Sequence, residues 1–141
     1  MKANELMIGD WVLFATRQTK INGIAEGGFS VNLEREGWQS ISAIEPIPLT
    51  AEILEKNGFK FDGSGQRSMM LISEPHFSEG IRYNIYVGLK KKTIEVFVAH
   101  PVEKSPNWRK SNKVYLEVCG LYVHELQHAL KLCGAPMQIS I

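Results

Sequence analysis

Residues 83–99 read YNIYVGLKKKTIEVFVA, and this stretch decides the fold. Two runs rich in β-branched and aromatic residues, Tyr83–Leu89 and Thr93–Ala99, stand on either side of three lysines. Such runs are typical of strands, and a short polar segment between them is typical of a hairpin loop. We therefore predict an antiparallel hairpin whose turn, Lys90–Lys92, is solvated and discourages edge-to-edge pairing. A phosphate contact is the functional alternative for these lysines.

Outward from this hairpin, further short strand patterns predict a sheet built around it. The polar segment 102–112, which contains Trp108, is expected to form a loop. A helix is expected after Thr50, a favourable N-cap residue, and it ends at Gly58. The additional strands of this half are expected at Phe59–Phe61, Arg67–Ser73, Val114–Val118 and, closing the chain, Met137–Ile141.

The first fifty residues contain only short strand patterns separated by turn residues. The expected strands are Asp10–Thr16, Thr19–Ala25, Phe29–Leu33, Trp38–Ile41 and Ile44–Ile47. Several short strands with tight turns indicate a small curled antiparallel sheet or an SH3-like barrel. The predicted fold class is α+β, with a barrel-like subdomain over residues 1–49 and an α+β subdomain over residues 50–141, or the two as one continuous domain.

Composition excludes several classes of protein. The chain has 141 residues and a formal net charge of +1, so it has no bulk attraction to nucleic acid or to anionic membranes. No apolar run reaches the length of about 18 residues that a transmembrane helix needs. The start, Met1–Leu6, has no hydrophobic signal segment. Two cysteines, Cys119 and Cys133, make no disulfide framework, so we expect a reduced, cytoplasmic setting and no membrane partner.

One short motif points to chemistry. Residues 124–128 read HELQH, which matches H-E-x-x-H, the helical motif in which two histidines bind zinc and the glutamate acts as general base. In that alternative His124 and His128 are the ligands, Glu125 activates the bound water, and the protein is a zinc-dependent hydrolase. A motif this short also arises by chance, so its surroundings decide.

The surroundings of this motif argue against zinc. We expect a helix over Tyr122–Cys133, ended by Gly134, with its apolar stripe facing away from His124 and His128. Both histidines are then expected on a solvent face. A catalytic zinc also needs a third protein ligand, and no spacing singles one out. The upstream candidates are His76, Glu95, His100 and Glu117. We therefore expect no cofactor and no catalytic residue.

A second functional pattern is an aromatic residue among positive charges. Trp108 is followed by Arg109 and Lys110, with further lysines nearby. This combination suits stacking on bases and neutralisation of phosphates in a single-stranded nucleic acid. The alternative is an exposed loop whose Trp packs back on the sheet, and the nearly neutral chain, with pI ≈ 7.8, favours that alternative. Partners from either class, another protein or a nucleic acid, stay open.

Three segments carry a resemblance to a known family. They are residues 1–12 (MKANELMIGDWV), residues 44–54 (IEPIPLTAEIL) with Gly58 and Phe59, and residues 122–127 (YVHELQ) with Leu130 and Gly134. On these segments, which cover about half of the chain, the protein resembles small uncharacterised proteins of Bacteroides-type bacteria and of their phages and mobile elements.

The resemblance implies an accessory protein of a phage or mobile element, and it implies no particular activity. In the similar proteins the last helix reads Tyr-Val-His-x-Leu-Gln-Asn, so the position of His128 is typically not histidine. This implies that His128 completes H-E-x-x-H by accident and that His124 packs or caps locally. We therefore expect a protein that acts by binding rather than by catalysis.

Overall fold

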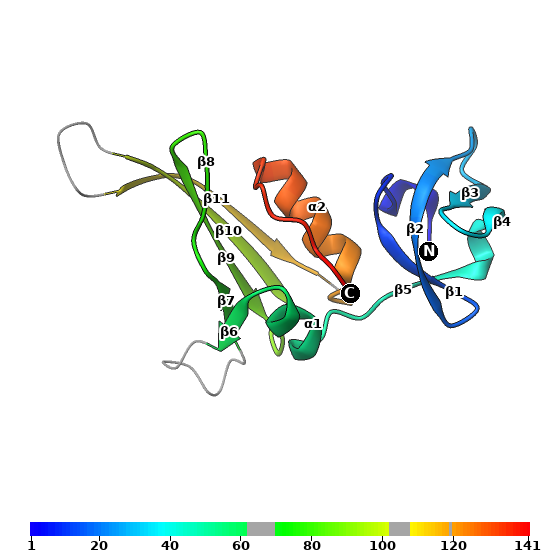
Figure 1. Ribbon diagram of the computed structural model, residues 1–141, viewed down its shortest axis with the longest axis horizontal. Helices are drawn as coiled ribbons and strands as arrows, with labels where there is room; N and C mark the ends of the chain where they lie inside the picture. The colour runs from blue at the N-terminus through cyan, green and yellow to red at the C-terminus, as the bar shows by residue number, and fades with distance from the viewer. Residues whose placement is uncertain (62–69, 102–107, 119) are drawn as a thin grey trace. The chain divides into compact units, whose positions relative to one another are not determined.

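The computed structural model describes residues 1–61, 70–101, 108–118 and 120–141 (Figure 1). Contacts divide the chain into two compact units, Met1–Pro48 with Tyr122–His124, and Leu49–Leu121 with Glu125–Ile141. The return of Tyr122–His124 to the first unit is not indicated by the sequence. It rests on backbone pairing, because the Val123 N–H donates to the Ile47 carbonyl at 2.9 Å and Pro48 forms a β-bridge with Tyr122.

The first unit is a five-stranded antiparallel sheet in the order β4-β3-β2-β1-β5. Its 3-10 helices are η1 (Ala3–Glu5) and η2 (Ile41–Ala43), and its strands are β1 (Trp11–Phe14), β2 (Arg17–Ile24), β3 (Ser30–Leu33), β4 (Gly37–Ser40) and β5 (Ile44–Pro46). Four strands follow one another as a meander, and β5 returns to pair with β1. The predicted curled antiparallel sheet is confirmed, and its likeness to an SH3 barrel stays a prediction.

The turn between β1 and β2 lies earlier than the sequence predicts. Ala15 and Thr16 form it, with φ of 45° and 68°, and Phe14 pairs with Arg17. The prediction that Thr16 belongs to the first strand and that residues 17–18 separate the first strand from the second was wrong, because β2 begins at Arg17. A two-residue hairpin turn of this kind needs positive φ at both positions, which usually means Asn or Gly. Neither Asn nor Gly occurs at these two positions, so the sequence gives no signal for the turn.

One face of this sheet carries the buried core of the first unit. Alternate residues on β2 and β3 point inward, as the period-two pattern of an antiparallel strand requires. The buried cluster consists of Leu6, Val12, Ile21, Val31, Leu33 and Ile44. The alternation that predicts the strands therefore also gives the core.

The second unit contains a six-stranded antiparallel sheet in the order β11-β10-β9-β7-β6, with β8 added along β9 (Figure 1). Its strands are β6 (Phe59–Phe61), β7 (Met70–Ser73), β8 (His76–Ser78), β9 (Ile81–Gly88), β10 (Thr93–Pro101) and β11 (Trp108–Glu117). The predicted hairpin at residues 83–99 is confirmed, with residues 89–92 as its turn. Together with the helices below, the two sheets confirm the α+β class.

Two helices complete the fold. Helix α1 (Ala51–Lys56) begins at the predicted cap, where the Thr50 hydroxyl accepts a hydrogen bond from the Ile53 N–H at 3.3 Å. Helix α2 (Val123–Cys133) lies along one face of the second sheet (Figure 1). Within the described residues, neither these nor the 3-10 helices have the length and hydropathy to cross a membrane.

Two predicted segments of the second unit were wrong. Trp108 to Asn112 was expected to be loop, but these residues belong to β11 and pair with β10; residues 102–107 lie outside the described residues. The terminal strand at Met137–Ile141 does not form, and Ser140 is held instead by the Asn57 side chain. A side-chain amide has an N–H donor and a carbonyl acceptor, as a backbone peptide has. The Asn57 side chain therefore bonds Ser140 in the way that a neighbouring strand would.

Candidate functional site

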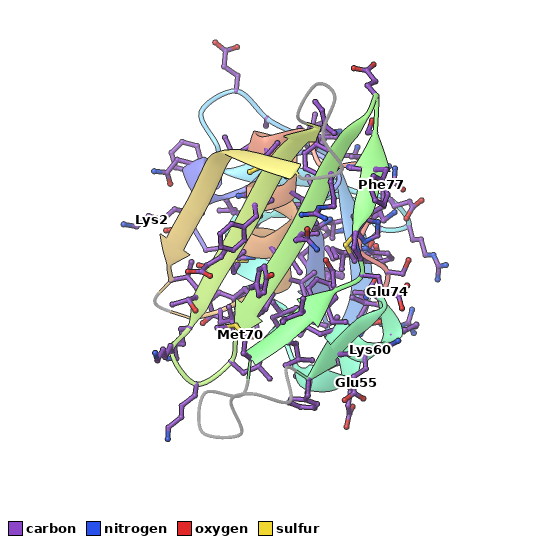
Figure 2. The ribbon with its side chains drawn as sticks, turned by 90° about the vertical axis from the view of Figure 1, so that its left-hand side faces the viewer. Lys2, Glu55, Lys60, Met70, Glu74 and Phe77 are labelled. Carbon is purple, nitrogen blue, oxygen red and sulfur yellow. The ribbon has the colours of Figure 1, made fainter. Side chains whose placement is uncertain are left out.

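Among the described residues, α2 covers one face of the second sheet and no helix covers the other (Figure 2). Alternate residues of β9 and β10, among them Ile85 and Val96, are buried on the face where α2 lies. The residues between them point to the other side and are only half-buried: Arg82, Asn84, Tyr86, Glu95 and Phe97. Figure 2 looks onto this second side of the sheet, with the strands in front of α2. We call these five residues the open face.

Strand register places the residues of the open face in neighbouring rows. Tyr86 on β9 stands opposite Glu95 on β10, and Asn84 stands opposite Phe97. The rings of Tyr86 and Phe97 meet across the strands, with centroids 5.0 Å apart and planes at 78°. Directly opposed residues on one face of an antiparallel pair lie within side-chain contact distance. The open face is thus an aromatic pair with a carboxylate and an amide beside it.

A basic residue and a further aromatic ring extend the open face toward β8. Arg82 pairs with Phe77 on β8 on one side and with Ala99 on β10 on the other. The Arg82 Nε is buried, while the residue as a whole is half-buried. Phe77 is 59% exposed and is labelled in Figure 2. Arginine and aromatic rings in adjacent rows offer both charge and flat surfaces to a ligand.

Positive charge gathers in the second unit. Twelve of the 16 Lys and Arg residues belong to it, against nine of the 15 Asp and Glu residues. The remaining four basic and six acidic residues belong to the first unit. The net charge of +1 is therefore the sum of a basic unit and an acidic one. The sequence argument from whole-chain charge concealed this separation.

The residues predicted to bind nucleic acid lie on the same sheet. Trp108, Arg109 and Lys110 open β11, where their backbones pair with Pro101, His100 and Ala99 of β10. Because Ala99 also pairs with Arg82, Lys110 and Arg82 hold positions in one row across three strands. Lys110, which the sequence suggested as a nucleic-acid contact, therefore lies in the same row of the sheet as Arg82 of the open face.

The H-E-x-x-H motif forms the first turns of α2, and the prediction that both its histidines face solvent was wrong. His124 is buried, with 6% of its surface exposed. Its ring stacks on Tyr122, with centroids 5.7 Å apart and planes at 10°. Glu125 and His128 are half-buried. The helical period alone assigns His124 to the polar side of α2, but the ring of Tyr122, two residues earlier, covers it.

The candidates for a third zinc ligand are dispersed over the second sheet. Glu95 lies on the open face, on the other side of the sheet from α2, so it cannot complete a site with His128. His76 lies on β8, and the backbones of His100 and Glu117 belong to β10 and β11. The described side chains form no group of three residues able to hold a metal ion.

Cysteine chemistry gives little support to a reactive site. Cys133, at the end of α2, is a free, half-buried thiol, and burial raises its pKa above the ordinary value of 9.0. A raised pKa disfavours the thiolate, which is the nucleophilic form. Cys119 lies outside the described residues.

Sequence reasoning missed the open face. The period-two pattern of Tyr83–Ala99 carries the information that Tyr86 and Phe97 point away from Ile85 and Val96. The pattern does not show which of the two faces α2 covers, because that depends on where the chain returns after β11.

Comparison of the chain with protein-family models, curated proteins and solved structures found no match.

Proposed function

We propose that the protein acts by binding rather than by catalysis, and that its ligand is a single-stranded nucleic acid held on the open face. The observation that carries this proposal is the half-buried pair Tyr86 and Phe97 beside Arg82. Aromatic side chains on a sheet surface stack on unpaired bases, which present a flat face whatever their sequence. Arginine adds a phosphate contact or a further stacking plane.

Charge supports the same ligand. Single-strand binders pair aromatic platforms with a positive surface that follows the phosphate chain. The second unit has an excess of basic residues, and two of them, Lys90 and Lys91, are exposed at the turn that joins β9 to β10. These are the two strands that carry Tyr86 and Phe97. The accessory role in a phage or mobile element that the resemblance implies is compatible with such a binder.

The experiment is a titration of fluorescently labelled single-stranded oligonucleotides at low salt, followed by anisotropy. We expect binding by the wild-type protein, weakened roughly tenfold by Phe97→Ala or Tyr86→Ala, because stacking is worth about 1–3 kcal/mol per base. Trp38→Ala is the matched control, since Trp38 is an aromatic residue of the first unit that is 57% exposed. Circular dichroism confirms that each variant is folded.

Two results would contradict the proposal. One is the absence of binding by the wild-type protein at low salt. The other is equal weakening by Trp38→Ala and Phe97→Ala, which would show that the open face has no special part in binding. Zinc-dependent hydrolysis through His124, Glu125 and His128 is the separate alternative. It is tested by measuring the zinc content of the protein and of the variant His128→Ala.

A further inference from the structure

The chain contains the dipeptide Asn-Gly twice, at Asn22–Gly23 and at Asn57–Gly58. Asparagine is one of the heat-labile residues of proteins. A glycine after it leaves the next peptide nitrogen unshielded, because glycine has no Cβ and turns freely. That nitrogen can then attack the side-chain amide of the asparagine. The two dipeptides have the same intrinsic chemistry, so their surroundings decide which of them reacts.

The reaction needs only the protein and water. The glycine nitrogen forms a bond to the asparagine Cγ, the Cγ–Nδ2 bond breaks, and the proton of the attacking nitrogen leaves with the amide as ammonia. The product is a cyclic imide. Water then adds to one of its two carbonyls and opens the ring. Opening on one side gives aspartate, and opening on the other gives isoaspartate, in which the backbone runs through the former side chain.

Asn22 is exposed and lies at an interruption of the first sheet. The pairing of β2 with β3 shifts between Ile21 and Gly23, so Asn22 is the extra residue of a bulge and has no partner in β3. A bulge locally disrupts the ladder that otherwise fixes the backbone. Within the described part of the chain, the Asn22 side chain forms no hydrogen bond. Its amide is therefore not held away from the Gly23 nitrogen.

Asn57 is half-buried, and both of its reacting groups are held. The Asn57 amide donates to the carbonyls of Ile53 and Ser140 and accepts from the Ser140 N–H. The Gly58 N–H, whose nitrogen would attack, donates to the Glu55 carbonyl at 3.0 Å. These hydrogen bonds must open before the reaction can begin, and each of them lowers the fraction of molecules that are able to react.

We infer that Asn22 is a site of spontaneous deamidation in the folded protein, and that its hydrogen bonds protect Asn57 from the same reaction. The isoaspartate product lengthens the backbone of β2 next to Gly23, which lies beside Asn32 and the Trp38 ring. Both products also add a negative charge to the acidic first unit. The modification belongs to the first unit and does not depend on what the second sheet binds.

The test is ageing of the folded protein at mildly alkaline pH, followed by peptide mapping with mass spectrometry. Each product is heavier than the amide by the difference between an oxygen atom and an NH group, so the map gives the rate at each asparagine. We expect Asn22 to convert at least about tenfold faster than Asn57, the factor that one opened hydrogen bond of ordinary strength can supply. In urea, where the hydrogen bonds are lost, the two rates should converge.

Gly23→Ala is the variant that should slow conversion at Asn22, because a methyl group shields the attacking nitrogen. Gly23 does not have a positive φ. A Cβ added there would lie 3.5 Å from the Asn32 Cβ and 3.7 Å from the Trp38 Cη2, which are ordinary contacts, so we expect the variant to fold.

Asn22→Asp is the matched control for the product, because it adds the same charge without lengthening the backbone. An exposed substitution of this kind usually has little effect on stability. The isoaspartate form, separated by chromatography, changes the spacing along β2 and with it the alternation of side chains between the two faces. We therefore expect the isoaspartate form, and not Asn22→Asp, to unfold at a clearly lower temperature than the wild-type protein.

Three results would overturn the inference. One is conversion of Asn57 in the folded protein at the rate of Asn22 or faster. Another is an unchanged Asn22 after a time in which the chain in urea has converted. The third is conversion of Asn22 in Gly23→Ala at the wild-type rate, which would mean that the following nitrogen is not the attacking group. The comparison of the two sites in the wild-type protein needs no variant, so it decides even if Gly23→Ala fails to fold.

Discussion

At the scale of single residues, the burial of His124 decides how H-E-x-x-H is interpreted. Its ring packs face to face on Tyr122 and has only 6% of its surface exposed. A stacked, buried imidazole contributes to folding through its packing, whatever its nitrogens do. His128, one turn later, is half-buried. The two histidines of the motif therefore have different surroundings, and their removal should have different consequences.

We expect His124→Ala to lower the free energy of unfolding by about 1–3 kcal/mol, the usual cost of truncating a buried side chain, and His128→Ala to lower it by less, because His128 is less buried. Denaturant unfolding measures both. Elemental mass spectrometry of protein purified without chelators or affinity metals should find well under one zinc per chain. One zinc per chain that is lost in His128→Ala would instead establish the zinc site and justify a search for hydrolase activity.

At the scale of elements, Asn57 links α1 to the C-terminal segment. The Asn57 Nδ2 donates to the carbonyls of Ile53 and Ser140, each at 2.7 Å, and its Oδ1 accepts from the Ser140 N–H at 2.8 Å. One side chain thus ends the helix and holds the segment that was expected to form a strand. Ile139, the residue before, is buried. The amide therefore holds an apolar anchor in place.

We expect Asn57→Ala to cost about 1 kcal/mol of stability, because the two hydrogen bonds to Ser140 are exposed and each contributes little net free energy. The sharper effect is local. Exchange of the Ser140 amide hydrogen, followed by NMR, should accelerate strongly in this variant, while amides of β9 and β10 keep their protection.

Asn57→Asp is the matched variant for this contact. It keeps the acceptor for the Ser140 N–H and loses both donors, so we expect an intermediate rate of exchange. Unchanged exchange at Ser140 in Asn57→Ala would show that Ile139 alone holds the segment.

At the scale of the whole molecule, local pattern predicted most strands but not their sides or partners. The cap at Thr50, the hairpin around residues 90–92 and the α+β class follow from neighbouring residues and are confirmed. The turn at Ala15 and Thr16 lacks the usual residues for positive φ, and β8 is only three residues long. The turn and β8 depend on pairing with neighbouring strands, and a short window of sequence does not contain those partners.

The open face could be predicted only in part, for the same reason. Alternation predicts that Tyr86 and Phe97 share a side of their strands, but two further facts come from tertiary contacts. One is that α2 covers the opposite side, and the other is that the rings meet at 78°. Each of these facts pairs residues that are distant along the chain.

The separation of charge gives the last prediction. Each phosphate that a protein neutralises on a single strand adds about 0.7 to the steepness with which log affinity falls with log salt. We expect the double variant Lys90→Gln, Lys91→Gln to make that slope shallower by about 1.4, because both lysines are exposed at the end of the strands that form the open face. Anisotropy titrations over a range of salt concentrations measure the slope.

The matched control is the double variant Arg17→Gln, Arg35→Gln, which removes two exposed charges from the acidic first unit and should leave the slope unchanged. An equal change in both double variants would mean that only net charge matters, and that the Lys90–Lys92 turn is simply solvated.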